Sequence, residues 1–162
     1  MNVLLNTACD LLLKNDLYLF EVWINERSLT HRLAVYLEEL FPDYHVDCEY
    51  NRNINENWEF ICKKLPPTIL EKIVTTRNTD GVSVFPDIII HTRWTDNNYV
   101  VIEAKKDTDS RKEEWRNEDI LKLRAYKNEF WYRYGYFLEF ITWKKPWYKL
   151  SLMNEEWELE QI

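Results

Sequence analysis

The sequence has little glycine and cysteine and no long apolar run, and each shortage excludes a class of protein. Two glycines in 162 residues exclude a glycine-rich linker or repeat protein, and no glycine-rich phosphate loop is present. The three cysteines are odd in number and lack Cys-x-x-Cys spacing, which indicates neither a disulfide framework nor a zinc site, so we expect reduced and buried thiols. No apolar run approaches the ~20 residues that cross a bilayer, so no membrane partner is expected.

The N-terminal stretch MNVLLNTACDLLLKND also lacks the features of an export signal. It has neither a basic segment at its start nor a small-residue cleavage site. The sequence therefore predicts a protein that is not exported and that works in the cytoplasm.

The residues that are present favour one folded domain. With 46% hydrophobic and 15% aromatic residues the chain is not disordered, and 162 residues suffice for one substantial core but not for two. We divide this single domain into an N-terminal helical cover (1–24), a core (25–143) and a C-terminal extension (144–162). The eight tryptophans offer stacking platforms for bases, but such residues more often fill a core or a dimer contact, which is the interpretation that we favour.

The clearest strands form a predicted hairpin. Residues 85–91 and 99–102 are apolar and rich in β-branched side chains, and Asn97-Asn98 makes a natural turn between them. Because side chains alternate across a strand, every second residue of each arm lies on the same face. The residues that share these faces are Asp87, Ile89 and His91 on the first arm and Tyr99, Val101, Glu103 and Lys105 on the second. Two carboxylates and a lysine can therefore converge.

Acids in such apolar strands need a partner, because an ionised carboxylate is costly to desolvate without a cation. Oxygen ligands on two adjacent strands suit Mg²⁺, with Mn²⁺ as the alternative, because Mg²⁺ accepts one or two carboxylates and leaves room for phosphate oxygens. Lys105 could orient an attacking water or neutralise charge on a phosphate. This chemistry fits phosphodiester hydrolysis. The alternative is a surface hairpin with solvated side chains.

The chain has Pro86-Asp87, then a gap of fifteen residues, and then Glu103-Ala104-Lys105 after a hydrophobic strand. This pattern resembles the motif of the PD-(D/E)XK nuclease superfamily, which includes the restriction-endonuclease-like folds. The resemblance implies an α/β (α+β) fold in which helices flank a central mixed sheet, with a core order of helix, three strands, helix and strand. It also implies that Asp87 and Glu103 bind the metal, that the Ala104 carbonyl is a third ligand, and that Lys105 activates water.

A helix that precedes these strands is predicted from Asn25 or Ser28, which can cap it, to Leu40, after which Phe41-Pro42 ends the run. In the family that the sequence resembles, the first helix often brings a further acid to the metal, and Glu26 is the candidate here. His31, one turn on, could reach the same cleft. The alternative for Glu26 is ordinary stabilisation of the helix dipole by an acid in the first turn.

A second flanking helix follows the hairpin. The segment DTDSRKEEWRNED is predicted to start as a loop, and a helix follows through residues 120–130. Lys122 and Tyr126 are neighbours on one face of it. One exonuclease branch of the resembled superfamily has Gln-x-x-x-Tyr in this helix, and the chain departs from it because Lys122 replaces the Gln. Lys106, Lys122 and Arg124 are candidate contacts to substrate phosphates, with a solvated helix edge as the alternative.

The remaining elements are a helix over residues 3–20 that bends near Asn15-Asp16, a strand over 45–50, and a strand over 134–143 that pairs in parallel with the hairpin through a helical crossover. Residues 144–162 are expected to add an edge strand. The segment 51–82 is the least informative, with a helix over 68–74 after Pro66-Pro67.

The net charge of −7 argues against broad nucleic-acid binding, although acids in a metal site do not repel phosphate once the metal is bound. The favoured hypothesis is a metal-dependent nuclease that acts on DNA in preference to RNA. The alternative is a catalytically inactive binding or assembly subunit of the same fold, and a homodimer or larger assembly stays open. A small-molecule enzyme of another fold ranks last, because no Ser/His/Asp signature is present.

Overall fold

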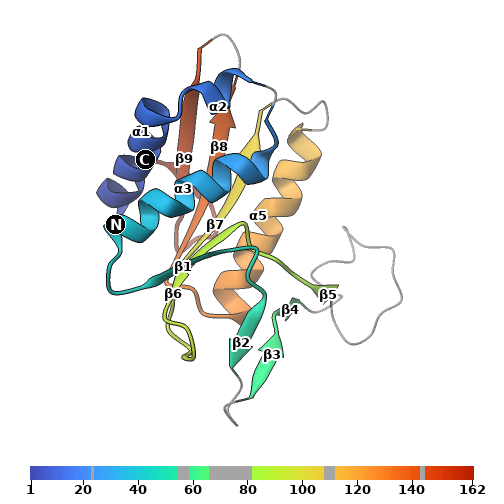
Figure 1. Ribbon diagram of the computed structural model, residues 1–162. Coiled ribbons are helices and arrows are strands. Elements are labelled where there is room, and N and C mark those ends of the chain that lie inside the picture. Colours follow the sequence, from blue (N-terminus) through green and yellow to red (C-terminus); the bar gives the residue numbers. More distant parts are fainter. Residues whose placement is uncertain (23, 55–58, 66–81, 108–111, 143–144) are drawn as a thin grey trace.

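The computed structural model describes the chain except residues 23, 55–58, 66–81, 108–111 and 143–144. It is a mixed α/β structure, as predicted, in which helices flank a six-stranded mixed sheet (Figure 1). The elements are α1 (Asn2–Asn15), α2 (Tyr18–Glu21), α3 (Glu26–Leu40), β1 (His45–Cys48), β2 (Arg52–Ile54), β3 (Phe60–Cys62), β4 (Lys64–Leu65), β5 (Val82–Ser83), β6 (Ile88–His91), β7 (Asn98–Lys106), α5 (Lys112–Glu129), β8 (Tyr134–Ile141), β9 (Trp147–Met153) and β10 (Leu159–Gln161).

The main sheet has the strand order β1-β6-β7-β8-β9-β10. The predicted hairpin is confirmed, since β6 pairs with β7 in an antiparallel manner. The predicted parallel pairing is also confirmed, because β7 pairs with β8 and α5 makes the crossover. Along the chain, α3, β1, β6, β7, α5 and β8 give the order helix, three strands of this sheet, helix and strand.

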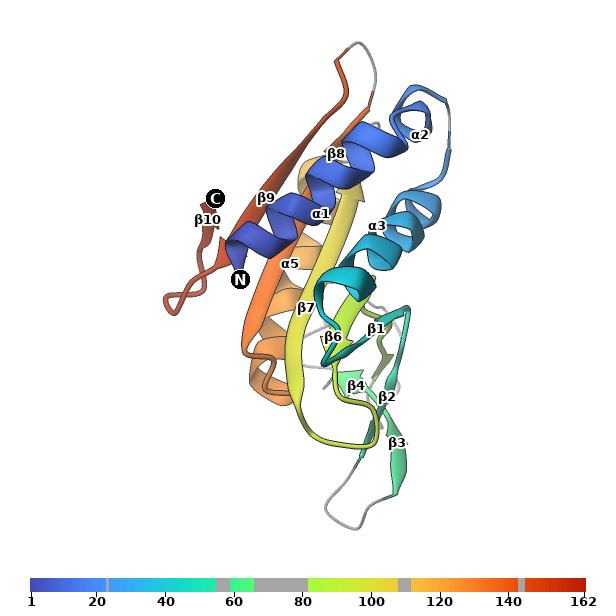
Figure 2. The same ribbon diagram turned by 60° about the vertical axis from the view of Figure 1, so that its left-hand side comes forward.

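Helices cover both faces of this sheet and produce two hydrophobic cores. Figures 1 and 2 show α1 and α3 on one face and α5 on the other. Ile88 and Ile90 of β6 pack with the leucines of α1 and α3, whereas Ile89 packs with Leu123 and Tyr126 of α5. This alternation is the expected result of a strand that is buried on both faces. Polar side chains on the face of β7 that lies toward α5 are therefore covered by this helix.

The ends of the N-terminal helices follow the predicted signals. The helical run breaks after Asn15, where α1 ends. The Asn25 side chain caps α3 and accepts a hydrogen bond from the Ser28 amide at 2.9 Å, and Phe41 ends the helix. Because this cap fixes where α3 begins, it also fixes the position of Glu26 in the first turn.

The structure corrects one expectation about the secondary structure and adds detail to two others. The helix α5 begins at Lys112 rather than near residue 120, because lysine, arginine and glutamate are good helix formers even where apolar residues are absent. The C-terminal extension contributes the expected edge strand, β10, and also a second strand, β9, which lies between β8 and β10. The register of β6 and β7 shifts at Tyr99, because Ile90 pairs with Val100 while His91 pairs with Asn98.

This β-bulge changes the face to which Tyr99 belongs. Its ring stacks on Tyr44 at a centroid distance of 4.5 Å, within the core that α1 and α3 cover. The predicted face that combined Tyr99 with Glu103 is therefore wrong for Tyr99. Glu103 keeps the predicted face that it shares with Lys105, and the structure shows that this face lies toward α5.

Burial of the tryptophans and cysteines also differs in part from the expectation. Trp94, Trp131 and Trp147 are exposed and do not fill the core. All three cysteines are free, but only Cys9 is fully buried.

The segments predicted as a helix over 68–74 and a loop over 77–81 lie outside the described residues. Within the described ranges, no helix has both the length and the apolar character needed to cross a membrane.

Candidate active site

Four carboxylates and two lysines gather between the sheet and α5. We call the four carboxylates, Glu26, Asp87, Glu103 and Asp119, the acidic cluster. Glu26 comes from the first turn of α3, Asp87 directly precedes β6, Glu103 lies in β7 and Asp119 lies in α5. The lysines are Lys105 of β7 and Lys122 of α5, and both interact with members of the cluster.

Asp87 is fixed by the strand that carries the other predicted ligand. Its Oδ2 atom accepts a hydrogen bond from the Ala104 amide at 2.8 Å. Burial nevertheless raises the pKa of Asp87 to about 6, and the negative charge of Glu26 adds to this, while the Ala104 hydrogen bond opposes it. The positive charge near this carboxyl group therefore does not offset its burial.

Glu103 is the most deeply buried of the acids. It is 3% exposed, and burial raises its pKa well above the ordinary value, with further increases from the charges of Asp87 and Asp119. The Tyr126 hydroxyl on α5 hydrogen-bonds to its side chain. Among the described residues, its Oε1 atom has no hydrogen-bond partner. An unsatisfied buried carboxyl oxygen is costly for the fold, which is typical of a group retained for function.

Glu26 reaches the same region from the opposite side of the hairpin. Its Oε2 atom accepts a hydrogen bond from the Lys106 amide at 2.7 Å, and its Oε1 atom lies 3.6 Å from the Lys105 ammonium. The structure thus brings Glu26, Asp87, Glu103 and Lys105 together, as the sequence analysis expected of their positions.

Asp119 is a member of the cluster that sequence reasoning missed. Its Oδ2 atom lies 3.0 Å from the Lys105 ammonium, and its Oδ1 atom lies 2.8 Å from that of Lys122. The spacing of Asp119, Lys122 and Tyr126 along α5 could have revealed it, because side chains three or four positions apart share a helix face.

The other candidates are placed differently. The Lys106 ammonium donates to the carbonyl of Ile24 at 2.7 Å, and the Arg124 guanidinium donates to the carbonyl of Trp157 at 2.7 and 3.0 Å. Arg124 is therefore engaged with the C-terminal extension and not with the cluster. Ala104 is fully buried, and its amide is bonded to Asp87.

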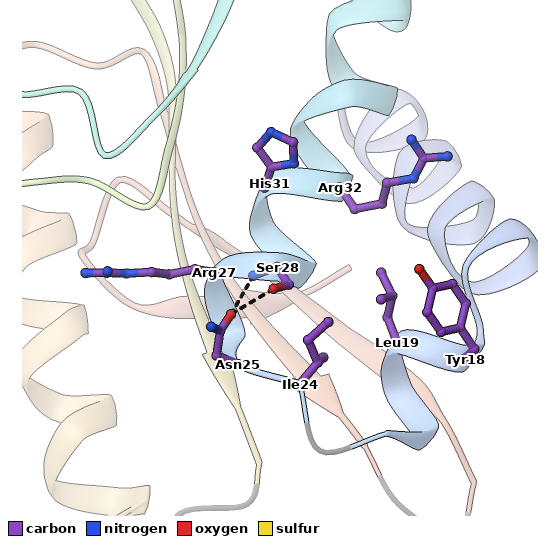
Figure 3. Close-up of a pocket in the computed structure, with 8 residues that line it drawn as sticks. All are labelled: Tyr18, Leu19, Ile24, Asn25, Arg27, Ser28, His31 and Arg32. Carbon is purple, nitrogen blue, oxygen red and sulfur yellow. Dashed lines mark hydrogen bonds between the residues drawn. The ribbon is translucent and has the colours of Figure 1, made fainter.

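His31 lines a surface depression of about 410 Å³ between α2 and α3, shown in Figure 3. Its lining includes Ser28 and Arg32 but no member of the acidic cluster. The structure does not bring His31 to the cleft that the sequence analysis considered.

The acidic cluster suits a divalent cation in its chemistry. Within the part of the chain that the structure describes, no three His, Cys, Asp or Glu side chains form a ready metal-ligand group. Mg²⁺, however, needs only one or two carboxylates and keeps several waters. The Oε1 atom of Glu103, which has no hydrogen-bond partner in the described part of the chain, and the raised pKa of Asp87 both indicate that the two lysines do not balance the acids. A cation held by these two carboxylates would relieve that shortage.

Comparison of the chain with protein-family models, with curated proteins and with solved structures finds no match. Function is therefore inferred from the geometry and chemistry of the acidic cluster and its lysines.

Proposed function

We propose that the chain is a metal-dependent nuclease of the PD-(D/E)XK type, which hydrolyses phosphodiester bonds in DNA rather than RNA. The observation that carries this proposal is the convergence of Asp87, Glu103 and Lys105 on one side of the hairpin, joined there by Glu26. The order helix, three strands, helix and strand supports a restriction-endonuclease-like core. The preference for DNA, the cytoplasmic location and a homodimer or larger assembly follow only from the resemblance and the sequence.

Asp87 and Glu103 are the residues that would hold Mg²⁺ or Mn²⁺. When bound, such a cation polarises the scissile phosphate and lowers the pKa of a coordinated water. Both carboxyl groups have raised pKa values in the structure, because each is buried close to other acids. They are therefore ready to exchange protons for a cation as the pH rises.

Lys105 acts as a fixed positive charge beside the reacting phosphate. Burial lowers its pKa, but the charges of Asp119 and Glu26 outweigh this and raise the pKa above its ordinary value. The ammonium group therefore stays charged at neutral pH. A charged donor in a partly buried site stabilises the negative charge that develops on the phosphate during hydrolysis.

A catalytically inactive binding or assembly subunit is the second candidate. It is favoured by the ion pairs that already neutralise part of the cluster, those of Asp119 with Lys105 and Lys122. An inactive subunit has no need to bind a divalent cation at Asp87 and Glu103. Calorimetry with Mg²⁺ or Mn²⁺ separates the two candidates, because the nuclease must bind the ion and Asp87→Asn must abolish that binding.

The activity itself is tested on a panel of single- and double-stranded DNA and RNA with Mg²⁺, with EDTA as the control. Asp87→Ala and Lys105→Ala should each lower cleavage by at least about a hundredfold, because the first removes a metal ligand and the second removes a positive charge that stabilises the transition state. Glu38→Ala, at an exposed position of α3, is the matched control and should cleave like the wild type. Retention of cleavage in both site variants would defeat the proposal.

A further inference from the structure

We propose that Asp119 is a positioning residue of this site, whose two carboxylate oxygens hold the ammonium groups of Lys105 and Lys122 beside the predicted metal ligands. This inference rests on the proposed nuclease function and assigns a role to an acid that the motif does not contain. It follows from the geometry of three side chains on two elements.

The contacts are close and involve both oxygens. Oδ2 of Asp119 lies 3.0 Å from Nζ of Lys105, and Oδ1 accepts a hydrogen bond from Nζ of Lys122 at 2.8 Å. The Lys122 contact is a charge-assisted hydrogen bond, which is the stronger kind, and the Lys105 contact is a close ion pair. One carboxylate therefore bridges two ammonium groups that belong to different elements, β7 and α5.

The burial of Asp119 makes this bridge different from a surface ion pair. Asp119 is 2% exposed, whereas the side chains of Lys105 and Lys122 are 22% and 30% exposed. A buried carboxylate needs cations to offset its desolvation, and the two lysines supply them. The lysines keep an outer surface toward solvent, where an anionic substrate can approach. Asp119 is shielded from that approach and cannot itself contact the substrate.

The two lysines would separate without this bridge, because like charges repel and long side chains lose rotamer freedom when they are held in place. With it, both ammonium groups stay close to Glu103, whose charge acts on both. Two positive charges fixed next to two metal ligands stabilise the additional negative charge that a phosphodiester gains in the transition state. The effect of Asp119 should therefore appear in turnover more than in substrate binding.

The test compares Asp119→Asn with Asp119→Glu in steady-state cleavage of DNA with Mg²⁺. Asp119→Asn keeps the shape but loses the charge that holds the lysines, so kcat should fall at least about tenfold. KM should stay the same or decrease, because one negative charge is removed from a site that binds an anion. Asp119→Glu restores the charge and should recover part of kcat.

Glu118→Gln is the matched control, because it makes the same chemical change at the neighbouring position, where no interaction with the cluster is found among the described residues. Its kcat and KM should equal those of the wild type. Thermal unfolding of every variant establishes that a loss of kcat is not a loss of fold. If Asp119→Asn does not fold, Lys122→Met removes the same contact from the other side and should also lower kcat.

The outcomes separate this inference from the proposed function. If the wild type cleaves DNA and the folded Asp119→Asn variant keeps the wild-type kcat and KM, the role of Asp119 is overturned and the nuclease proposal stands. The same holds for Lys122→Met where it replaces Asp119→Asn. A rise in KM with unchanged kcat overturns it as well, because that pattern indicates substrate binding alone. A wild type that cleaves none of the substrates with Mg²⁺ overturns both.

Discussion

The Glu26 carboxylate accepts a hydrogen bond from the main-chain amide of Lys106 at 2.7 Å, which ties the first turn of α3 to the end of β7. The acid therefore has a structural role in addition to its place in the acidic cluster. A glutamine at this position keeps an acceptor oxygen, whereas an alanine leaves the amide without its partner.

Glu26→Ala should lower the free energy of unfolding by about 1–3 kcal/mol, the usual cost of an unsatisfied polar group that is shielded from water. Glu26→Gln should lower it far less. Urea denaturation measures both, with Glu38→Ala on the exposed face of the same helix expected within about 0.5 kcal/mol of the wild type. Equal losses for the alanine and glutamine variants would show that the charge, and not the hydrogen bond, is what matters.

Asp87→Asn should stabilise the protein at neutral pH while it removes activity. The folded-state pKa of Asp87 is about 6 against an ordinary 3.8, so the folded state binds more protons between these values. Wild-type stability therefore falls as the pH rises from 3.8 to 6, by at most about 3 kcal/mol. The variant has no such titration, and asparagine can still accept the Ala104 hydrogen bond.

Denaturation at pH 3.5 and pH 7.5 checks this pH dependence. The advantage of Asp87→Asn should be present at the higher pH and absent at the lower one. Asp43→Asn, an exposed acid in the loop after α3, should show no advantage at either pH. A destabilised Asp87→Asn at pH 7.5 would mean that a cation or another positive charge already satisfies the carboxylate.

Mg²⁺ should raise the thermal unfolding temperature of the wild type, because a ligand that binds only the folded state stabilises it. The increase should be large at pH 8 and small at pH 5, since Asp87 must lose its proton to bind a metal and its pKa is about 6. Differential scanning calorimetry with and without Mg²⁺ measures it. Asp87→Asn and Glu103→Gln should abolish the increase, and an equal increase in these variants would place the ion elsewhere.

Lys63→Met should stabilise the protein below pH 8. Lys63 is fully buried, its ammonium lies 5.4 Å from the ring centroids of Tyr50 and Tyr132, and it has no hydrogen-bond partner among the described residues. Burial lowers its pKa to about 8 from 10.5, although Asp47 opposes this. A buried ammonium without an anionic partner costs stability that an apolar side chain of similar length does not.

The sign of this effect is also testable. Between pH 8 and 10.5 the unfolded chain binds more protons at Lys63 than the folded one, so wild-type stability rises with pH across this window. The advantage of Lys63→Met, up to about 3 kcal/mol at pH 7, should therefore shrink as the pH approaches 10.5. Lys64→Met, at the exposed neighbouring position, is the control and should show neither the gain nor the pH dependence.

Local sequence patterns were sufficient for the parts of the fold that local chemistry determines. The cap at Asn25, the apolar arms of the hairpin and the β-type run of β8 all formed as predicted. The positions of Asp87 and Glu103 followed from these strands, because alternation and a short loop leave few ways to pair them.

Tertiary contacts determined what the sequence did not reveal. Asp119 lies in a charged segment without apolar periodicity, and its importance depends on a lysine that arrives from another element. The bulge at Tyr99 places its ring against that of Tyr44, which the α3 to β1 connection brings beside it. Spacing within α5 could point to Asp119, but it could not identify Lys105 as its partner, nor Tyr44 as the partner of Tyr99.

The hydrogen bond between Asp87 and the Ala104 amide makes that amide a spectroscopic reporter of the site. The chemical shift of an amide proton that is hydrogen-bonded to a carboxylate changes when that carboxylate binds another group. The nitrogen and proton resonances of Ala104 should therefore shift in a magnesium titration without any substrate, so that cation binding at the site can be followed separately from cleavage.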